Sequence, residues 1–157
     1  MGSSAPEDVD YRAIYRASVD AYLILAADPP NYTIVDMSDE YARVTGADRE
    51  RALGEPLFEA FPEGTSNGTE RIRQSLETVL REGRPDSIGA FRFDLPYPDE
   101  PDAEPRPRYW SPLNIPIFDD DGEITHVVNR VHEITEFILR EQHRPLLEEE
   151  EPREVRI

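Results

Sequence analysis

RYWSPLNIPIFDDDGEITHVVNRVHEITE, residues 108–136, predicts two strands, the turn between them and the start of a helix. The run Asp119–Gly122 has the chemistry of a tight turn, because Asp side chains bond their own backbone and Gly supplies a positive φ. In residues 124–132 the even-numbered and odd-numbered positions form two different sets of side chains. Such an alternation with a period of two is typical of a strand with two faces. Thr135 then stands where it would cap a helix.

The spacing of apolar residues and the turn signals predict the other elements. Residues 69–82 form the most regular helix, because their apolar side chains recur on one face. The remaining elements are a short helix from Asp10, strands at 22–26 and 32–35, helices at 39–45 and 48–53, and strands at 87–95, 109–118 and 123–131. This order indicates an α+β fold, with a five-stranded antiparallel sheet, helices across one face and flanking helices at both ends.

Acidic residues dominate the composition. The chain carries 34 Asp and Glu against 17 basic residues, all of them Arg, for a net charge of −17. Such a surface repels phosphate backbones and we find no basic stripe, so no nucleic-acid partner is expected. The longest apolar run, Ala21–Ala27, is far shorter than the ~20 residues that cross a bilayer, and the acidic N-terminus lacks a signal-peptide pattern. We therefore expect a soluble cytoplasmic protein without membrane insertion.

Several local stretches are similar to motifs of the PAS family of sensory domains. They are DAYLIL (20–25), YARVTG (41–46), LGEPLFEAFP (53–62), RYWSPLN (108–114) and the closing EITE (133–136). Each is weak alone, but their order and spacing resemble a PAS domain over about residues 10–138. The resemblance implies a PAS-like domain whose last strand continues into an output helix.

The same resemblance suggests how the chain is organised and used. We expect a disordered leader at 1–9, a sensory domain at 10–138, and the end of the output helix with an acidic tail at 139–157. PAS domains sense signals for other proteins, so the resemblance implies signal transduction of the histidine-kinase, two-component type. Any kinase or other output activity would then lie outside this chain.

Metal, haem and thiol chemistry find little support in the sequence. His126 and His132 lie on one predicted strand roughly 20 Å apart, so they cannot ligate one ion. Haem-binding relatives usually place their His on the long helix, and residues 69–82 contain none. The chain has no Cys, which excludes disulfides, thiolate ligands and a thiol-linked flavin. We assign no catalytic residue and no metal ligand, and the cofactor stays open.

A sensory pocket is expected between the sheet and the helices. Aromatic side chains would supply contact area there, and two Asn residues would orient a polar ligand. The candidate lining residues are Tyr41, Phe58, Phe61, Ile72, Leu76, Phe91, Trp110, Asn114 and Asn129. Asn129 is the sharpest candidate, because it lies on the last strand, close to the output helix.

Three functions remain open on the sequence. The first is a sensory domain that binds a small ligand or a partner protein and relays the signal to the C-terminal helix. The second is a ligand-free interaction module, and a homodimer through the N-terminal helix and the sheet face fits either. The third is a small α+β pocket enzyme of the isomerase or dehydratase type, which needs a buried Asp or Glu facing an apolar cavity.

Overall fold

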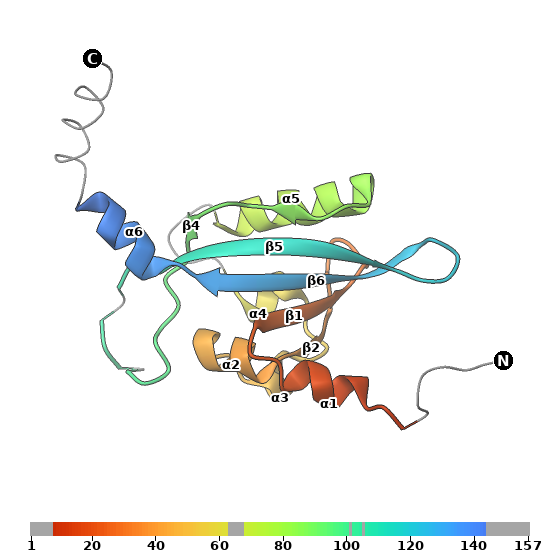
Figure 1. Ribbon diagram of the computed structural model, residues 1–157, viewed down its shortest axis with the longest axis horizontal. Helices are drawn as coiled ribbons and strands as arrows, with labels where there is room; N and C mark the ends of the chain where they lie inside the picture. The colour runs from red at the N-terminus through yellow and green to blue at the C-terminus, as the bar shows by residue number, and fades with distance from the viewer. Residues whose placement is uncertain (1–7, 63–67, 101, 105, 144–157) are drawn as a thin grey trace, which may run out of the picture.

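The computed structural model describes residues 8–62, 68–100, 102–104 and 106–143, which form an antiparallel sheet with helices packed against it (Figure 1). The strands are β1 (Ala21–Ala26), β2 (Ile34–Met37), β3 (Asp86–Ser87), β4 (Phe91–Arg92), β5 (Tyr109–Phe118) and β6 (Ile124–Glu133). The helices are α1 (Tyr11–Arg16), α2 (Asp39–Thr45), α3 (Arg49–Ala52), α4 (Leu57–Ala60), α5 (Gly68–Glu82) and α6 (Thr135–Gln142). Most of the expected leader and tail, residues 1–7 and 144–157, lies outside the described residues.

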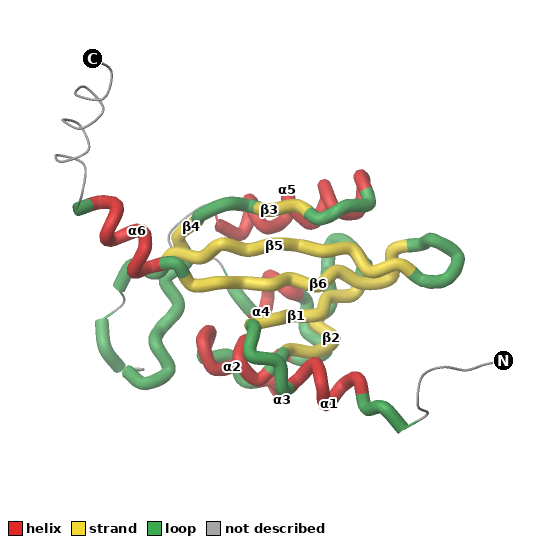
Figure 2. Tube along the Cα trace, in the orientation of Figure 1, coloured by secondary structure: helices red, strands yellow, loops and turns green. Residues whose placement is uncertain are grey.

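The strand order within the sheet is β2-β1-β6-β5-β3, and β4 also pairs with β5 (Figure 2). Every pairing is antiparallel, so the α+β fold and the antiparallel sheet are confirmed. The last strand, β6, lies at the centre and pairs with both β1 and β5. Within the part of the chain that the structure describes, no helix is both long and apolar enough to cross a membrane.

The hairpin at 108–136 forms as its sequence predicts. The Asp119 carboxylate accepts the backbone N–H groups of Asp121 and Glu123 at 2.9 and 3.0 Å, and Gly122 adopts φ +82°. These bonds replace ladder bonds that the chain loses at the reversal, so the turn fixes the register of β5 against β6. In that register Asn114 lies opposite Asn129.

The expected strand at 87–95 is wrong in its extent. The chain forms two short strands there, β3 and β4, and Gly89 between them adopts φ +80°. A residue at positive φ does not continue a strand, so the ladder along β5 is interrupted and resumes at Phe91. The sheet therefore has six strands among the described residues instead of five.

The helices between β2 and β3 follow local signals. Ser38 accepts the backbone N–H of Tyr41 at 3.2 Å and caps α2, which ends at Gly46 with φ +74°. One further helix, α4, forms between the helices expected at 48–53 and 69–82. Together with α5 these helices cover the inner face of the sheet, whose buried residues alternate along β1.

The core lies between that inner face and the helices. Leu23 and Leu25 on β1 and Val127 on β6 meet Leu76 and Val79 on α5, and all are buried. Removing this apolar surface from water stabilises the domain by about 25 cal/mol per Å². The same packing holds the strands and helices that surround the candidate site.

Candidate functional site

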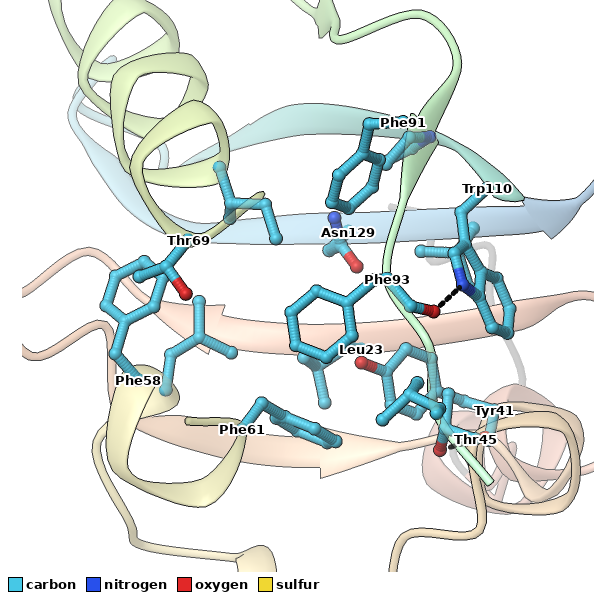
Figure 3. Close-up of a pocket in the computed structure, with 15 residues that line it drawn as sticks. Leu23, Tyr41, Thr45, Phe58, Phe61, Thr69, Phe91, Phe93, Trp110 and Asn129 are labelled. Atoms are coloured by element: carbon cyan, nitrogen blue, oxygen red, sulfur yellow. Dashed lines mark hydrogen bonds between the residues drawn. The ribbon is translucent and has the colours of Figure 1, made fainter. Parts of the chain in front are cut away.

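A cavity of about 60 Å³ lies between the inner face of the sheet and helices α2, α4 and α5 (Figure 3). Its wall combines four strands, three helices and the segment after β4, and it is almost entirely apolar. The lining residues are Leu23, Tyr41, Thr45, Leu57, Phe58, Phe61, Thr69, Ile72, Phe91, Phe93, Leu95, Trp110, Pro112, Asn129 and Val131. A cavity of this size has room for a few water molecules or a ligand of several heavy atoms.

Most of the candidate residues from the sequence meet at this cavity. Those that line it are Tyr41, Phe58, Phe61, Ile72, Phe91, Trp110 and Asn129. Leu76 lies deeper in the core and is fully buried, and Asn114 stands behind Asn129 without reaching the wall.

The remaining lining residues were not among the candidates, and some carried a usable signal. Pro112 shares its parity with Trp110, and Val131 shares its parity with Asn129, so strand alternation alone indicates that both face inward. Phe93 and Leu95 share their parity with Phe91, so the same alternation within the expected strand at 87–95 indicates them as well.

Aromatic contacts give the wall a defined shape. Tyr41 and Phe61 meet edge to face with ring centroids 6.1 Å apart, and Phe91 and Phe93 do so at 6.3 Å. The indole N–H of Trp110 donates to the carbonyl of Phe93 at 2.8 Å. This bond fastens the segment after β4 over the cavity although that segment is not a strand.

Tyr41 and Asn129 present polar groups to the cavity. The hydroxyl of Tyr41 and the side-chain oxygen of Asn129 both point into it in Figure 3. Burial raises the pKa of Tyr41, so the phenol stays neutral and can donate or accept a hydrogen bond. Thr45 donates to the carbonyl of Tyr41 at 2.7 Å, so its hydroxyl is satisfied within the last turn of α2.

A chain of buried hydrogen bonds runs away from the cavity through Asn129. Its amide nitrogen donates to Asn114 at 2.8 Å, and the amide nitrogen of Asn114 donates to the Ser75 hydroxyl at 2.9 Å. Ser75 in turn donates to the Asp86 carboxylate at 2.7 Å. The chain connects β6, β5, α5 and β3 in that order.

Arg108, immediately before β5, is the largest fully buried polar side chain near the site, with 1% of its surface exposed. Its guanidinium pairs with Glu133 at 2.7 and 3.0 Å and stacks 4.7 Å from the Trp110 ring. It also donates to the carbonyls of Val44 at 2.9 Å and Leu95 at 3.1 Å. One side chain therefore connects α2, the segment after β4, β5 and the end of β6.

Glu133 connects this network to the first residue of α6. Burial acts to raise the pKa of Glu133, but hydrogen bonds from Arg108, Thr135 and Tyr97 and the charge of Arg108 outweigh it, so the pKa lies below its usual range. The Thr135 hydroxyl donates to Glu133 at 2.8 Å and accepts the backbone N–H of Tyr109 at 2.9 Å.

The expectation that Thr135 caps the last helix is wrong. Ile134 occupies the cap position and offers no side-chain bond, while Thr135 is already the first residue of α6. Its hydroxyl bonds to Tyr109 on β5 and to Glu133 on β6, so it joins the start of α6 to the sheet. It does not accept a backbone N–H group from the first turn of α6, as a capping residue would.

Metal-binding and catalytic groups are not gathered at this cavity. The lining residues within the described ranges include no Asp, Glu or His, and the described residues contain no group of three His, Cys, Asp or Glu that could hold a metal ion. The isomerase or dehydratase alternative needs a carboxylate in the wall, and the described wall does not supply it.

Comparisons with known proteins point to one fold. A family model described as PAS fold matches residues 17–138. The PAS domain of a protein from Colwellia psychrerythraea is 16% identical with a TM-score of 0.59, over 80% of this chain and 96% of that one. A sensory box sensor histidine kinase from Vibrio cholerae is 20% identical with a TM-score of 0.52, over 78% and 87%.

An RNA-binding Light-Oxygen-Voltage receptor is also similar, with 15% identity and a TM-score of 0.67, over 88% of this chain and 36% of that one. At these identities the solved structures show a shared fold and nothing finer. No curated protein sequence matches the chain.

Proposed function

The chain belongs to the PAS fold family, and on that basis we propose that it is the sensory domain of a signalling protein and binds a small molecule in the cavity. The ligand would be uncharged and mostly apolar, because the described wall offers aromatic and aliphatic side chains and no counter-ion. The proposal includes a cytoplasmic location and two-component signalling, for which the composition and the likeness to a sensor histidine kinase are the support.

The observation that carries the proposal is the shared wall between the cavity and the start of α6. Trp110 lines the cavity, stacks on Arg108 and lies opposite Glu133 in the β5–β6 ladder. Glu133 accepts the Thr135 hydroxyl at the first residue of α6. A ligand that moves the Trp110 ring therefore changes contacts only two side chains away from α6.

The signal would be a shift between two packings of this network. A ligand changes such an equilibrium only by its difference in affinity for the two states. Arg108 can exchange partners between a tight and a loosened arrangement, because two of its carbonyl acceptors, Leu95 and Pro96, lie in the segment after β4, which is not a strand. Movement of Arg108 would release Glu133 and with it the start of α6.

A thiol-linked flavin or a haem does not fit this site. The chain has no Cys, and the described wall has no His. Pockets for drug-sized ligands are about 300–1,000 Å³, well above the cavity of about 60 Å³ found here. We therefore propose a much smaller ligand than a tricyclic cofactor.

Native mass spectrometry of the gently purified protein tests the proposal. A retained small molecule is expected in the wild type and is lost in Val131→Phe, which fills the cavity from β6. His132→Phe is the matched control, because His132 lies on the same strand with the opposite parity and is exposed, facing away from the cavity. A bare wild-type chain that also gains no stability from any small molecule in a ligand screen contradicts the proposal.

A second function, dimerisation, has its own observation. The outer face of the sheet carries an apolar row, in which Ile24, Val128 and Ile115 lie side by side on β1, β6 and β5. A sheet face in contact with water usually carries polar side chains, so this row indicates a covered surface. Nearby, α1 leaves Tyr11 68% exposed and Ile14 62% exposed. We propose that a second copy of the chain covers this face and α1.

Helix α1 is held in place to serve such an interface. Arg16 pairs with the buried carboxylate of Asp36 at 3.1 Å, and the ring of Tyr15 stacks on Tyr22 with centroids 5.8 Å apart. Tyr15 therefore faces the sheet, while Tyr11 and Ile14 remain available to a partner.

Light scattering over a range of protein concentrations tests the dimer. Ile14→Glu and Ile115→Glu are expected to give monomers, because each places a charge in the apolar interface. Gln74→Glu, at an exposed position of α5, is the control and should leave the mass unchanged. A wild-type monomer at high concentration contradicts this proposal without affecting the ligand proposal.

A further inference from the structure

The hydrogen-bond chain from Asn129 to Asp86 has a fixed direction, and that direction determines which ligands the cavity accepts. An amide oxygen and an amide nitrogen are nearly identical in shape, so either Asn could in principle point either way. The carboxylate at the end of the chain removes this freedom. A carboxylate only accepts, so the single hydroxyl proton of Ser75 must go to Asp86.

Each following bond is then determined in turn. With its proton committed to Asp86, Ser75 can only accept from Asn114, which must present its NH₂ group. The oxygen of Asn114 is left to face Asn129, and Asn129 must donate its own NH₂ group to it. The side-chain oxygen of Asn129 therefore remains for the cavity, and Figure 3 shows it on that side.

The burial of these side chains gives the direction of the chain an energetic effect on ligand binding. Asn114 is fully buried, and Ser75 and Asn129 are buried as well, so the chain lies in a region of low dielectric. There a polar group without a partner is costly, and bonds in a chain strengthen one another. No described side chain donates to the Asn129 oxygen, so a ligand that donates to it completes the chain.

We propose, as an extension of the proposed function, that the cavity selects a small, uncharged, mostly apolar ligand with a hydroxyl or N–H donor, and that Asp86 enforces this choice through Ser75, Asn114 and Asn129. A molecule of the same shape that only accepts hydrogen bonds places its oxygen against the oxygen of Asn129. The Tyr41 hydroxyl serves either molecule, because it both donates and accepts. Discrimination therefore comes from Asn129.

The binding of 2-butanol and 2-butanone, which have nearly the same shape, tests the proposal. Dissociation constants come from titrations followed by the side-chain amide resonances of Asn129 and Asn114. The alcohol should bind about threefold to tenfold more tightly than the ketone to the wild type, as expected for one net hydrogen bond.

Asp86→Asn should abolish this preference, because an amide at this position can donate to Ser75 and allows the chain to reverse. Ser75→Ala cuts the chain at its middle and should have the same effect, so the test survives if one variant fails to fold. Ser87→Ala on the same strand is the control, because Ser87 lies opposite Leu113 and outside the chain, and it should keep the preference.

The outcomes separate the two proposals. Equal binding of both probes, tighter binding of the ketone, or a preference that survives in Asp86→Asn and Ser75→Ala overturns the inference and leaves the ligand site standing. If neither probe stabilises the wild type against heat any more than it stabilises Val131→Phe, the ligand site and the inference both fall.

Discussion

Replacing Arg108 should loosen the start of α6 more than any other single change near the cavity. In Arg108→Met the stem is kept, but the pair with Glu133 and the bonds to the carbonyls of Val44, Leu95 and Pro96 are lost. Arg108 is 1% exposed and the Glu133 side chain 24% exposed, so Glu133 recovers some hydration after the change.

The size of the effect follows from this burial. Removing one partner of a buried ion pair costs about 3–5 kcal/mol, and the partial exposure of Glu133 places the expected loss near the lower end, at about 3 kcal/mol. Glu133→Gln keeps the shape and most of the bonds, so we expect a loss of about 1–2 kcal/mol. Because the two residues contact one another, the losses should not add in the double variant.

The pH dependence has a definite sign. The pKa of Glu133 is lowered in the folded protein, so its contribution is fully present above the unfolded pKa, near 4.5, and is lost as the pH falls through the folded value. The difference in stability between wild type and Glu133→Gln should therefore shrink as the pH falls below about 4.5.

Urea denaturation at pH 7 and at acidic pH measures these energies, and hydrogen exchange of residues 136–142 reports on α6. We expect faster exchange there in Arg108→Met than in Leu76→Ala, which lowers stability from a site remote from α6. The reasoning is refuted if the losses for Arg108→Met and Glu133→Gln add, or if exchange in α6 is unchanged.

Three further outcomes are expected. Leu76→Ala should lower the free energy of unfolding by about 2–5 kcal/mol in urea denaturation, because Leu76 is fully buried; a loss below 1 kcal/mol would contradict the packing described. Burial raises the pKa of Tyr41 above its ordinary value of 10.0, so stability should fall as the pH rises above 10, and Tyr41→Phe should weaken this fall in alkaline denaturation curves. Gly122→Ala should cost about 1 kcal/mol in thermal unfolding, because φ is +82° and no neighbouring atom is close to the added methyl group; equal stability would show that the turn relaxes.

The parts of the fold that sequence reasoning predicts are those with local causes. Ser38 begins α2 and Gly46 ends it through contacts with residues only a few positions away. Asp119 and Gly122 form their turn through equally local contacts. The interruption at Gly89 was missed, because a single Gly within an apolar run is compatible with either a continuous or a broken strand.

The candidate site was predictable to the extent that strand alternation reveals which side chains face inward. Trp110 and Asn129 are examples, whereas the role of Arg108 depends on Glu133, which lies 25 residues away. A chain with 34 acidic residues offers many partners for any Arg, so composition could not select this pair. The bond between Asn114 and Ser75 spans 39 residues and depends on how α5 lies on the sheet.

The central position of β6 also has a consequence for synthesis of the protein. β1 and β2 leave the ribosome early, but Leu23 pairs with Asn129, so the main partner of β1 is made almost last. Until then the N-terminal hairpin exposes an open edge, and pairing across so long a loop is slow. Nascent chains arrested before Val131 should remain sensitive to protease, and the domain should close only once the final strand has emerged from the exit tunnel.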